Sequence, residues 1–477
     1  MIYRLASRVE LAEREDGNFL VSKNPLCVLR LNPSLTEMIR RGLTGDLVAR
    51  SAAEQSVLEQ LAAKGFVQRV RESSALPDVL PTVSVVVPVK DRADELLRCL
   101  ESISRINYPQ SLLQVIVVDD GSSDSSADVA RGAGAIVIPS GGTGRGPAAA
   151  RNVGSRAATG DILAFIDSDC TASTNWLAEL IPAFDDPKMA AAGGVVDGMC
   201  TESLIDRYET VMSSLSLGLR ERSGNTGDDT FYLPSCNLLV RRSAFLDVGG
   251  FVDTMHVGED VDLTWRLRDN GWTIAYLPVG RVYHEHRSSL RSFMSRRFDY
   301  GTSEGMLQTL HPQRHKRMVV PPLLALLLVL CCAAPFVSWW LLALAGLVLL
   351  IDAVVVRVKF IRRKLPLGMP TLLAGRLRAL GSLVYYLSFH LIRYYLIPLL
   401  AVSLLFPLMF AVTAGMLLCA ARVDYSVKKP LHLPFIMFTA VYLMEQVSYG
   451  AGVFWGCFTR RTFSSYRVVL LRHAVVP

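Results

Sequence analysis

The segment ILAFIDSDC at residues 162–170 constrains the fold of this chain more than any other. Its apolar run followed by Asp167 and Asp169 predicts a buried strand with carboxylates at its C-terminal end, the edge where open α/β sheets bind ligands. A second segment, VIVVDDGSSD, ends in Asp119 and Asp120 and predicts another acid-tipped strand. Carboxylate oxygens suit Mg²⁺ or Mn²⁺, which can bridge a diphosphate. Two such strands indicate an enzyme that binds a sugar nucleotide.

Strands and helices alternate from Thr82 to about Arg317. The all-apolar run VSVVVPV is typical of a strand covered on both faces, and AIVIPS and the two acid-tipped segments repeat the pattern with helical segments between them. Such βαβ repeats favour a sheet with helices on both sides. We therefore expect an α/β domain at residues 82–317, built on a doubly wound nucleotide-binding sheet.

Residues 1–72 have a different pattern, which predicts a small separate domain. NFLVSKNPLCVLRLN indicates two strands joined by a turn, and FVQRV a closing strand. Two short helices are expected between them, each with the spacing of a capping box. The capping residues would be Ser34 with Glu37, and Ser51 with Glu54. This combination favours a winged-helix-like module, followed by a linker at residues 73–81, SSALPDVLP.

Residues 318–477 form an apolar C-terminal region that is predicted to contact a membrane. Met318–Ile351 holds no charged residue and exceeds one span of about 20 residues, so Pro335 and Ser338 near its middle predict two short helices in a hairpin. A second uncharged stretch, Tyr394–Ala421, is interrupted by two prolines, Pro398 and Pro407. A third, Leu431–Met444, is followed by Glu445 and Gln446 and favours an interfacial helix.

The polar part of the chain is expected to face the cytoplasm. The N-terminus has no apolar core after a charged start, so no signal peptide is visible. The cluster RVKFIRRK at residues 357–364 would return to the cytoplasm after a hairpin, as the positive-inside rule prefers. We therefore predict a multi-pass protein of the cell membrane, in contact with membrane lipid. Its net charge of +7 is explained by such basic flanks, and the polar part lacks the basic and aromatic runs of a nucleic-acid-binding protein.

The two acids of the DDGS segment are predicted to contact substrate, but a plainer interpretation is open. A carboxylate of Asp119 or Asp120 at a strand end can accept from a uracil N–H or from ribose hydroxyls, but D-D-G-S is also ordinary turn chemistry. The loop GGTGRGPAAARN opens a helix, so that its N–H groups and either Arg145 or Arg151 could reach phosphates, although glycine-rich loops are common. Asp167, at the end of the buried strand, is a further candidate for substrate binding.

The segment HVGEDVDLTWRL supplies a candidate general base. Glu259 and Asp260 begin an amphipathic helix, where acids also complement the helix dipole. Once a metal–diphosphate leaving group is proposed, a carboxylate such as Asp260 could take the proton from an attacking hydroxyl, with Glu259 beside it contacting substrate.

Three further groups follow in VYHEHRSS and SFMSRRF. His284 and His286 fall on one face of a predicted strand and are candidates for a third metal ligand beside Asp169. Arg296 and Arg297 could neutralise a diphosphate, although basic residues just before a membrane segment are also expected as positive-inside flanks.

The order of these motifs resembles family 2 of the inverting glycosyltransferases, which have the GT-A fold. The resemblance rests on VSVVVPVKDR, VVDDGSSD, AARN, FIDSDC, CNLLVRRSAFLDVGGF and GEDVDLTWRL, over roughly residues 82–300. It implies that Asp119 and Asp120 bind uridine, that Asp169 ligates the metal, and that Asp260 is the base. The Q-x-x-R-W signature of processive polysaccharide synthases is missing, because SFMSRRF stands in its place.

The whole architecture resembles one subfamily, the mycofactocin-system glycosyltransferases. NPLCVLRLNPSLTEMI is similar to PqqD-like peptide-recognition modules, and YGAGVFWGCFTRRT to the C-terminal end of that subfamily. The resemblance implies transfer of glucose from UDP-glucose to a redox cofactor made from a ribosomal peptide, with a β-linked product. Two alternatives stay open: a lipid- or cell-wall-directed transferase of the same fold, and a non-catalytic peptide-binding membrane scaffold.

Overall fold

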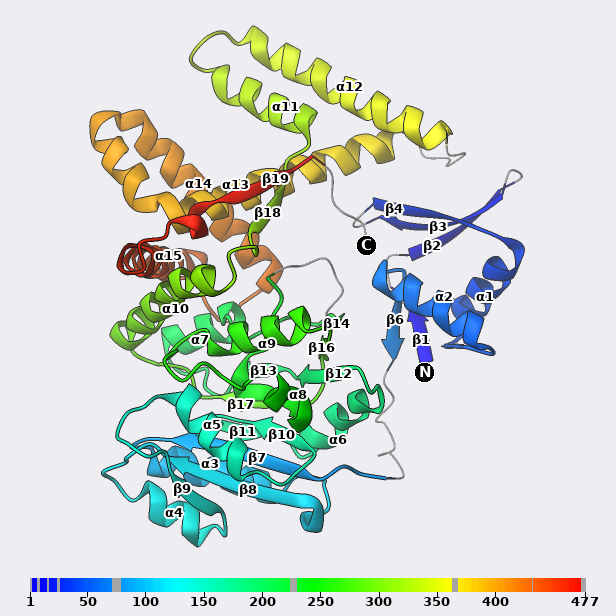
Figure 1. Ribbon diagram of the computed structural model, residues 1–477. Helices are drawn as coiled ribbons and strands as arrows, with labels where there is room; N and C mark the ends of the chain where they lie inside the picture. Colours follow the sequence, from blue (N-terminus) through cyan, green and yellow to red (C-terminus); the bar gives the residue numbers. More distant parts are fainter. Residues whose placement is uncertain are drawn as a thin grey trace. The chain divides into compact units, whose positions relative to one another are not determined.

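The structure is a computed structural model that describes residues 2–6, 9–14, 17–23, 26–70, 79–223, 230–362, 368–430 and 432–472. The chain forms two compact units (Figure 1). One contains the N-terminal segment up to Ser74 together with Met318–Tyr386 and the strand residues from Leu470. The other contains Ala75–Arg317 and Leu387–Val469. The apolar C-terminal region is therefore shared between the two units.

The N-terminal segment consists of two three-stranded antiparallel sheets and two helices around a small core. Its elements are β1 (Ile2–Leu5), β2 (Val9–Arg14), β3 (Gly17–Lys23), β4 (Leu26–Leu31), α1 (Pro33–Thr44), β5 (Leu47–Val48), α2 (Ala52–Ala63) and β6 (Val67–Val70). The sheet orders are β5-β1-β6 and β2-β3-β4. The predicted strand pair, β3 and β4, and the closing strand, β6, are confirmed. Most of the predicted linker lies outside the described residues.

The caps of the two N-terminal helices differ in part from the predicted capping boxes. Asn32, and not Ser34, caps α1, because its side chain accepts from the Leu35 N–H at 2.8 Å. Ser51 caps α2 as expected, but the Glu54 carboxylate accepts from the Arg50 N–H instead of the Ser51 N–H. In both cases one side-chain oxygen satisfies a donor that the helix itself leaves unpaired.

The second unit is built on an eight-stranded mixed sheet of order β14-β16-β12-β15-β10-β7-β8-β9. Its strands are β7 (Val83–Val89), β8 (Leu113–Asp119), β9 (Ile136–Pro139), β10 (Ile162–Phe165), β12 (Met189–Gly193), β14 (Arg222–Ser223), β15 (Leu238–Arg241) and β16 (Thr273–Tyr276). The four strands predicted from sequence, β7 to β10, are parallel neighbours. The doubly wound expectation is incomplete, because β15 inserts antiparallel between β10 and β12. A small second sheet has the order β11-β17-β13, from β11 (Cys170–Ala172), β13 (Val196–Gly198) and β17 (Val282–His284).

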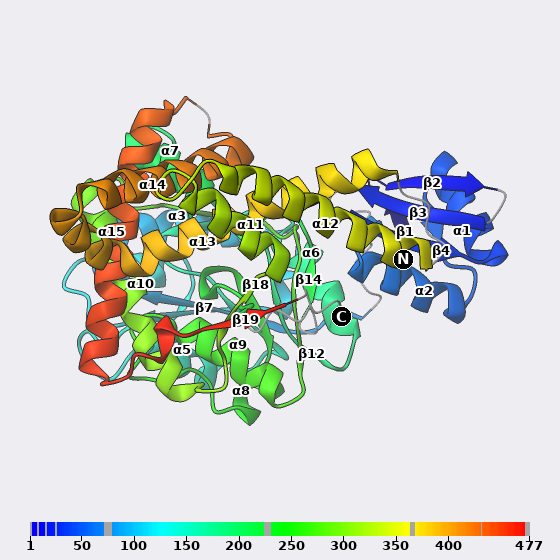
Figure 2. The same ribbon diagram turned by 90° about the horizontal axis from the view of Figure 1, so that it is seen from above.

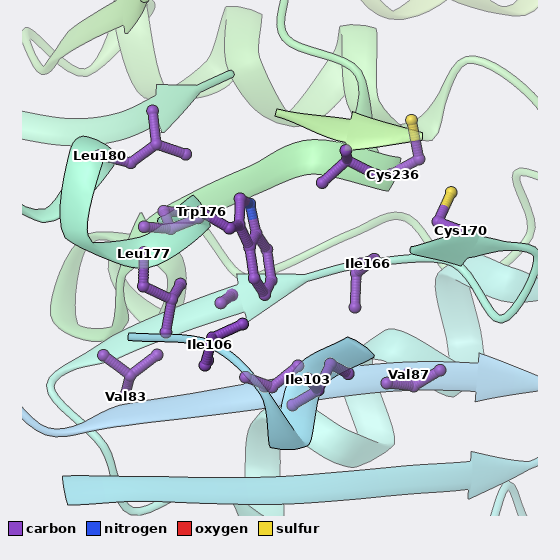
Figure 3. Packing of buried hydrophobic residues seen from close by; sticks show 14 of the residues in the cluster. Val83, Val87, Ile103, Ile106, Ile166, Cys170, Trp176, Leu177, Leu180 and Cys236 are labelled. Atoms are coloured by element: carbon purple, nitrogen blue, oxygen red, sulfur yellow. The ribbon is translucent and has the colours of Figure 1, made fainter. Parts of the chain in front are cut away.

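Helices cover both faces of the large sheet. They are α3 (Ala93–Ser104), α4 (Ser126–Gly132), α5 (Pro147–Ala157), α6 (Trp176–Leu180), α8 (Arg242–Asp247) and α9 (Glu259–Asp269), with short 3₁₀ turns at Gln110–Leu112, Ile181–Asp185 and Ser235–Asn237. Another helix, α7 (Leu204–Met212), packs against β13 and α15 instead. Alternate residues of β7 belong to two separate cores: Val85 and Val87 pack with α3 and α6, whereas Val86 packs with α5, α8 and α9. Figure 3 shows part of the first core, with Cys170 and Cys236 at one end. This two-sided burial explains the uninterrupted apolar strands of the sequence.

Two long helices of this unit lie in backbone contact. They are α10 (Leu290–Leu310) and α15 (Phe435–Thr459), and they run side by side in Figures 1 and 2. A Cβ added at Gly301 would lie 2.2 Å from the Tyr449 carbonyl oxygen, and one at Gly452 would lie 2.0 Å from the Phe298 carbonyl oxygen. Gly305 and Gly456 are equally close to the facing backbone. Only glycine fits at these four positions, so the pairs fix how α15 sits on α10.

The remaining elements contain the apolar segments. They are β18 (Lys316–Val319), α11 (Pro322–Ala333), α12 (Trp340–Arg362), α13 (Met369–Leu405), α14 (Pro407–Lys428), a 3₁₀ turn at Ser464–Tyr466 and β19 (Val468–Leu471). Three of the described helices, α12, α13 and α14, are long and apolar enough to cross a membrane.

Several details of these apolar segments differ from the sequence-based expectation. The predicted hairpin is present as α11 and α12, but α12 is long, because it continues through the basic residues as far as Arg362. Pro398 lies inside α13 instead of interrupting it, whereas Pro407 begins α14, where a missing N–H has no cost. Glu445 and Gln446 are buried in the middle of α15, and this helix is not among the candidate spans.

Candidate active site

A cavity of about 740 Å³ lies at the C-terminal edge of β7, β8 and β10. Its lining includes residues from the ends of these strands, from α9, and from α10, α13 and α15. All of the described lining residues belong to the second unit. Among them are Asp120, Arg151, Asp167, Asp169, Glu259, Asp260, His284, Arg296 and Arg297, which were proposed from sequence. The fold thus brings acids from three separate motifs to one cavity.

The acids Asp167 and Asp169 follow β10 directly, as the sequence predicts. The short sheet positions His284 beside them, because Cys170 of β11 is paired with His284 of β17 and the Glu285 N–H donates to the Asp169 carbonyl oxygen at 2.9 Å. As a result, His284 Nε2 lies 3.6 Å from Asp169 Oδ1. Burial opposes ionisation of Asp169, but the charges of His284 and Arg92 outweigh it and lower its pKa.

The residues at this point fit a divalent cation. One ligand atom each from Asp169, Cys170 and His284 lies within 4.8 Å of the others. A carboxylate oxygen and an imidazole nitrogen are donors that Mn²⁺ accepts, and the carboxylate also suits Mg²⁺. Burial raises the pKa of the Cys170 thiol well above its usual value, so the acid–imidazole pair is the better donor set.

Asp260 lines the same cavity, at the start of α9. Gly258, with φ +79°, turns the chain into this helix, and the Ser235 N–H donates to Asp260 Oδ2 at 3.2 Å. Burial and the neighbouring charge of Glu259 raise the pKa of Asp260 to about 7. A carboxyl group with this pKa can accept a proton at neutral pH, as a general base must.

Arg151 links the two groups of acids. Its side chain is 2% exposed, and its guanidinium donates to Asp167 Oδ1 at 2.5 Å and to Glu259 Oε1 at 2.7 Å. The charges of these two carboxylates raise its pKa against the effect of burial. The sequence suggested that Arg151 could reach phosphates. Its observed contacts instead make it a bridge between the strand-end loop and the start of α9.

Asp119 and Asp120 have different surroundings. Asp119 Oδ1 accepts from the Ser122 N–H at 2.9 Å within the turn after β8, which is the plainer of the two interpretations given above, and it is not among the described lining residues of the cavity. Asp120 is buried and accepts from the N–H groups of Arg145 and Gly146 at 3.0 and 2.9 Å. It therefore holds the glycine-rich loop in place at the cavity wall.

The remaining candidates divide between the cavity and the interior. Arg296 lines the cavity and stacks on the ring of Tyr300. Arg297 is 3% exposed and donates to Glu209 Oε1 at 2.8 Å, so its charge is held by a buried acid. His286 Nδ1 lies 3.6 Å from Glu209 Oε2, and its ring centroid lies 4.8 Å from that of His284. Burial with the charges of His284 and Arg297 lowers the pKa of His286 to about 3.

Two features of the site were not found from sequence. Arg92, at the start of α3, donates to Asp169 Oδ2 at 2.6 Å, and Arg287 lines the same part of the cavity. Arg92 comes just after the apolar strand β7, and a basic residue at the end of such a strand could have been recognised as a candidate site residue. At the other end, Glu304 Oε1 accepts from Tyr394 and Tyr449 hydroxyls at 2.7 and 2.6 Å. No local pattern announces this second cluster, because its members come from distant parts of the chain.

Comparison with known proteins agrees with this geometry. Residues 84–249 match glycosyl transferase family 2. The chain is 38% identical over 309 residues to the pre-mycofactocin glycosyltransferase of Mycobacterium tuberculosis (strain ATCC 25618 / H37Rv), an alignment that covers 64% of this chain. The chain spans 63% of the length of that relative. A third of the chain is therefore similar to glycosyl transferase family 2, and a longer part of it is similar to the pre-mycofactocin glycosyltransferase.

Two more distant similarities cover different shares of the chain. The chain is 29% identical over 212 residues to glycosyltransferase AglE of Haloferax volcanii, covering 42% of this chain and 66% of that protein. Among solved structures, the mannosyltransferase PcManGT from Pyrobaculum calidifontis, in complex with GDP-Man and Mn²⁺, aligns with a TM-score of 0.42 and 20% identity. That alignment covers 77% of this chain and 94% of the mannosyltransferase.

Replacing Arg151 should destabilise the domain strongly. In Arg151→Met the chain keeps the volume of the side chain but leaves Asp167 and the buried Glu259 without their shared cation. We expect a loss of about 3–5 kcal/mol in the free energy of unfolding, measured by urea denaturation. The matched control is Arg131→Met, which breaks an exposed pair with Asp128 and should cost about 0.5 kcal/mol or less. Equal stability of the two variants would contradict the bridging role.

Proposed function

We propose that this relative of the pre-mycofactocin glycosyltransferase transfers glucose from UDP-glucose to a hydroxyl of a peptide-derived redox cofactor, with inversion at the anomeric carbon. The observation that carries the proposal is that the Asp169–His284 pair and Asp260 line the same cavity. A nucleotide-sugar donor needs a neutralised diphosphate, and an attacking hydroxyl needs a base. The Asp169–His284 pair can hold the cation that neutralises the diphosphate, and Asp260 can serve as the base.

The proposed mechanism is a single displacement. Asp260 takes the proton from the acceptor hydroxyl as its oxygen bonds to the anomeric carbon, while the bond from that carbon to the diphosphate oxygen breaks. A divalent cation held by Asp169 and His284 would neutralise the departing diphosphate. Arg287 and Arg296 line the cavity and add positive charge to it. Arg151 acts only through Asp167 and Glu259, by holding the two sides of the site together.

Substitution of the two acids should separate binding from chemistry. Asp169→Ala should weaken UDP-glucose binding in the presence of Mn²⁺, measured by calorimetry, because it removes a metal ligand. Asp260→Asn should leave that binding intact but lower turnover by about 10²–10⁴-fold, because the amide cannot take the proton. Asp128→Asn, an exposed acid on α4, is the control and should change neither quantity. Asp260→Asn with near-normal turnover would overturn the assignment of the base.

The pH dependence of transfer tests the same residue independently. Because the pKa of Asp260 is raised to about 7, the base is protonated below this pH and ionised above it. The value of kcat/KM should therefore rise tenfold per pH unit below about 7 and level off above it. The profile is measured with saturating Mn²⁺. The ascending limb should disappear from the residual activity of Asp260→Asn, and a wild-type profile that is flat from pH 5.5 to 8 would contradict the proposal.

One displacement also fixes the stereochemistry of the product. An α-linked sugar nucleotide must give a β-linked glucoside when one base activates one hydroxyl. The coupling constant of the anomeric proton in the NMR spectrum distinguishes the two linkages. An α-linked product would rule out the single displacement.

The far end of the cavity favours a polar acceptor over a lipid. Glu304 is paired there with Lys316 at 2.6 Å and with two tyrosine hydroxyls, and Gln308 and Arg467 line the same cavity. Burial alone would raise the pKa of Glu304, but Lys316 and the hydroxyl donors lower it. An alkyl or prenyl chain placed here would desolvate these charges without replacing their hydrogen bonds. An acceptor with hydroxyl and amide groups would replace them.

Changes in the Glu304 cluster should affect the acceptor and spare the donor. Tyr449→Phe removes one hydrogen bond to Glu304 and should raise the KM for a small peptide-derived acceptor by roughly 3–10-fold. The rate of UDP-glucose hydrolysis without acceptor should not change. Tyr386→Phe, an exposed tyrosine of α13, is the control. Efficient transfer to undecaprenyl phosphate in place of the small acceptor would instead support the lipid-directed alternative.

The proposal extends to the N-terminal segment and to cellular location. The sheet β2-β3-β4 has β2 and β4 as its edges among the described strands, and an extended peptide can add to such an edge. This supports a PqqD-like role for residues 1–72 in retaining the precursor peptide. The candidate membrane helices support attachment to the cell membrane, with the catalytic unit in the cytoplasm where sugar nucleotides are made.

A further inference from the structure

The apolar segment between Tyr394 and Ala420 begins and ends on the catalytic unit. At its start, the Tyr394 hydroxyl donates to Glu304 at the reaction cavity, and Arg393 Nη1 donates to Gln446 Oε1 of α15 at 3.0 Å. At its end, Ala420 and Ala421 of α14 are fully buried. They pack in a cluster with residues of α7, α10 and α15, and α14 lies beside α15 in Figure 1.

Between these two anchors the chain can extend only a short distance. Residues 395–405 complete α13 and residues 407–419 begin α14, with the turn at Phe406. A helix rises 1.5 Å per residue, so the two arms reach about 17 and 20 Å from the catalytic unit. The hydrocarbon core of a bilayer is about 30 Å thick. Although α13 and α14 are long enough to cross a membrane as whole helices, the parts that leave the catalytic unit are too short.

The turn between the arms has the surface of a membrane-embedded element. No charged residue occurs between Arg393 and Arg422. Leu404 is 86% exposed, Leu405 77% and Phe406 61%, and further exposed apolar side chains of α14 follow, namely Leu408, Phe410 and Val412. The two hydroxyl groups buried here, of Ser403 and Thr413, donate to carbonyl oxygens of their own helices, so they carry no unpaired donor into an apolar environment.

The base of the segment carries positive charge. Arg422 and Lys428 are on the last turns of α14, and both are exposed. Basic residues at this level are attracted to anionic phospholipid headgroups, whereas the apolar tip beyond them would be unfavourable in water. Positive charge at the base and an apolar surface at the tip match the charged headgroups and the hydrocarbon chains of one leaflet, in that order.

We propose that residues 395–419 form a re-entrant loop that enters one leaflet of a bilayer and returns to the same side, with Leu404–Phe410 at its deepest point. The partner of this surface is the lipid hydrocarbon. The reaction cavity then lies directly at the membrane surface, because Tyr394 contributes both to its wall and to the base of the loop. The inference concerns attachment and does not depend on which sugar or acceptor the site takes.

The same anchors limit the topology of the preceding segment. Lys316 and Arg393 both line the reaction cavity, so the chain between them leaves the catalytic unit and returns to it. Any membrane crossings between these residues must therefore come in pairs. A multi-pass arrangement, as predicted from sequence, would need both α12 and the first part of α13 to cross, while α13 and α14 beyond Arg393 add no crossing.

Labelling of an introduced cysteine tests the loop. The full-length Leu405→Cys protein, in sealed vesicles of known orientation, is treated with a membrane-impermeant polyethylene glycol maleimide, and added mass is compared with the wild type and its native cysteines. We expect no added label from either side of the membrane, and one added label after detergent. Leu246→Cys, an exposed position on α8, is the control and should gain one label only from the side of the catalytic unit.

Each other outcome overturns the proposal. Added label from the side opposite the catalytic unit would mean that the segment spans the bilayer. Label from the same side without detergent would mean that the loop lies in water. No label in detergent would mean that protein, such as a second copy of the chain, covers the tip. Leu408→Cys repeats the test if Leu405→Cys does not fold, and detection of UDP-glucose hydrolysis in the same vesicles keeps the result separate from the catalytic proposal.

Discussion

The catalytic unit depends on one buried cation between two carboxylates. Arg151 joins Asp167, which follows a central strand, to Glu259, which begins α9. Two acids this close would repel each other in the interior, and each alone would be expensive to bury. With Arg151 between them, Asp169 lies two residues from one end of the bridge and Asp260 lies one residue from the other, and both acids line the same cavity. The positions of both carboxylates therefore depend on this buried contact.

A second constraint comes from glycine. The close approach of Gly301 and Gly305 to α15 makes the C-terminal helices part of the cavity instead of an appendage to it. Glu304, between these glycines, can then reach Tyr449 on α15 and Tyr394 on α13. The family match ends at residue 249, so this entire wall lies beyond it. The strand ends with Asp120, Asp167 and Asp169 thus lie within that match, and the Glu304 cluster lies outside it.

The positions of the candidate acids could be predicted from sequence because each lies next to a regular element. Asp167 and Asp169 follow an apolar strand, and Asp260 begins an amphipathic helix, so each could be placed at a sheet edge or helix end before the structure was known. The antiparallel insertion of β15 was missed, because a short apolar segment does not reveal its direction. Arg151 was given a different partner, since a guanidinium in a glycine-rich loop suits phosphate as well as carboxylate. In the Glu304 cluster the two tyrosines are 90 and 145 positions from Glu304 in the sequence. A pattern of neighbouring residues cannot predict contacts over such separations.

For the apolar segments, hydropathy predicts the surroundings of a helix more reliably than it predicts whether the helix crosses a membrane. The composition of α13 and α14 suits a membrane, and their length would allow each to cross. Length is decisive only if the whole helix is free to enter the bilayer, and both helices have one end packed on the catalytic unit. The polar contacts of Arg393 and the buried alanines near the end of α14 keep the adjoining helical turns on the catalytic unit. The parts of the two helices that are free to enter a bilayer are each shorter than its hydrocarbon core is thick. Polar and apolar surroundings therefore meet on one helix: α13 contributes Tyr394 to the cavity wall and, a few turns later, its exposed last leucines to the apolar turn before α14.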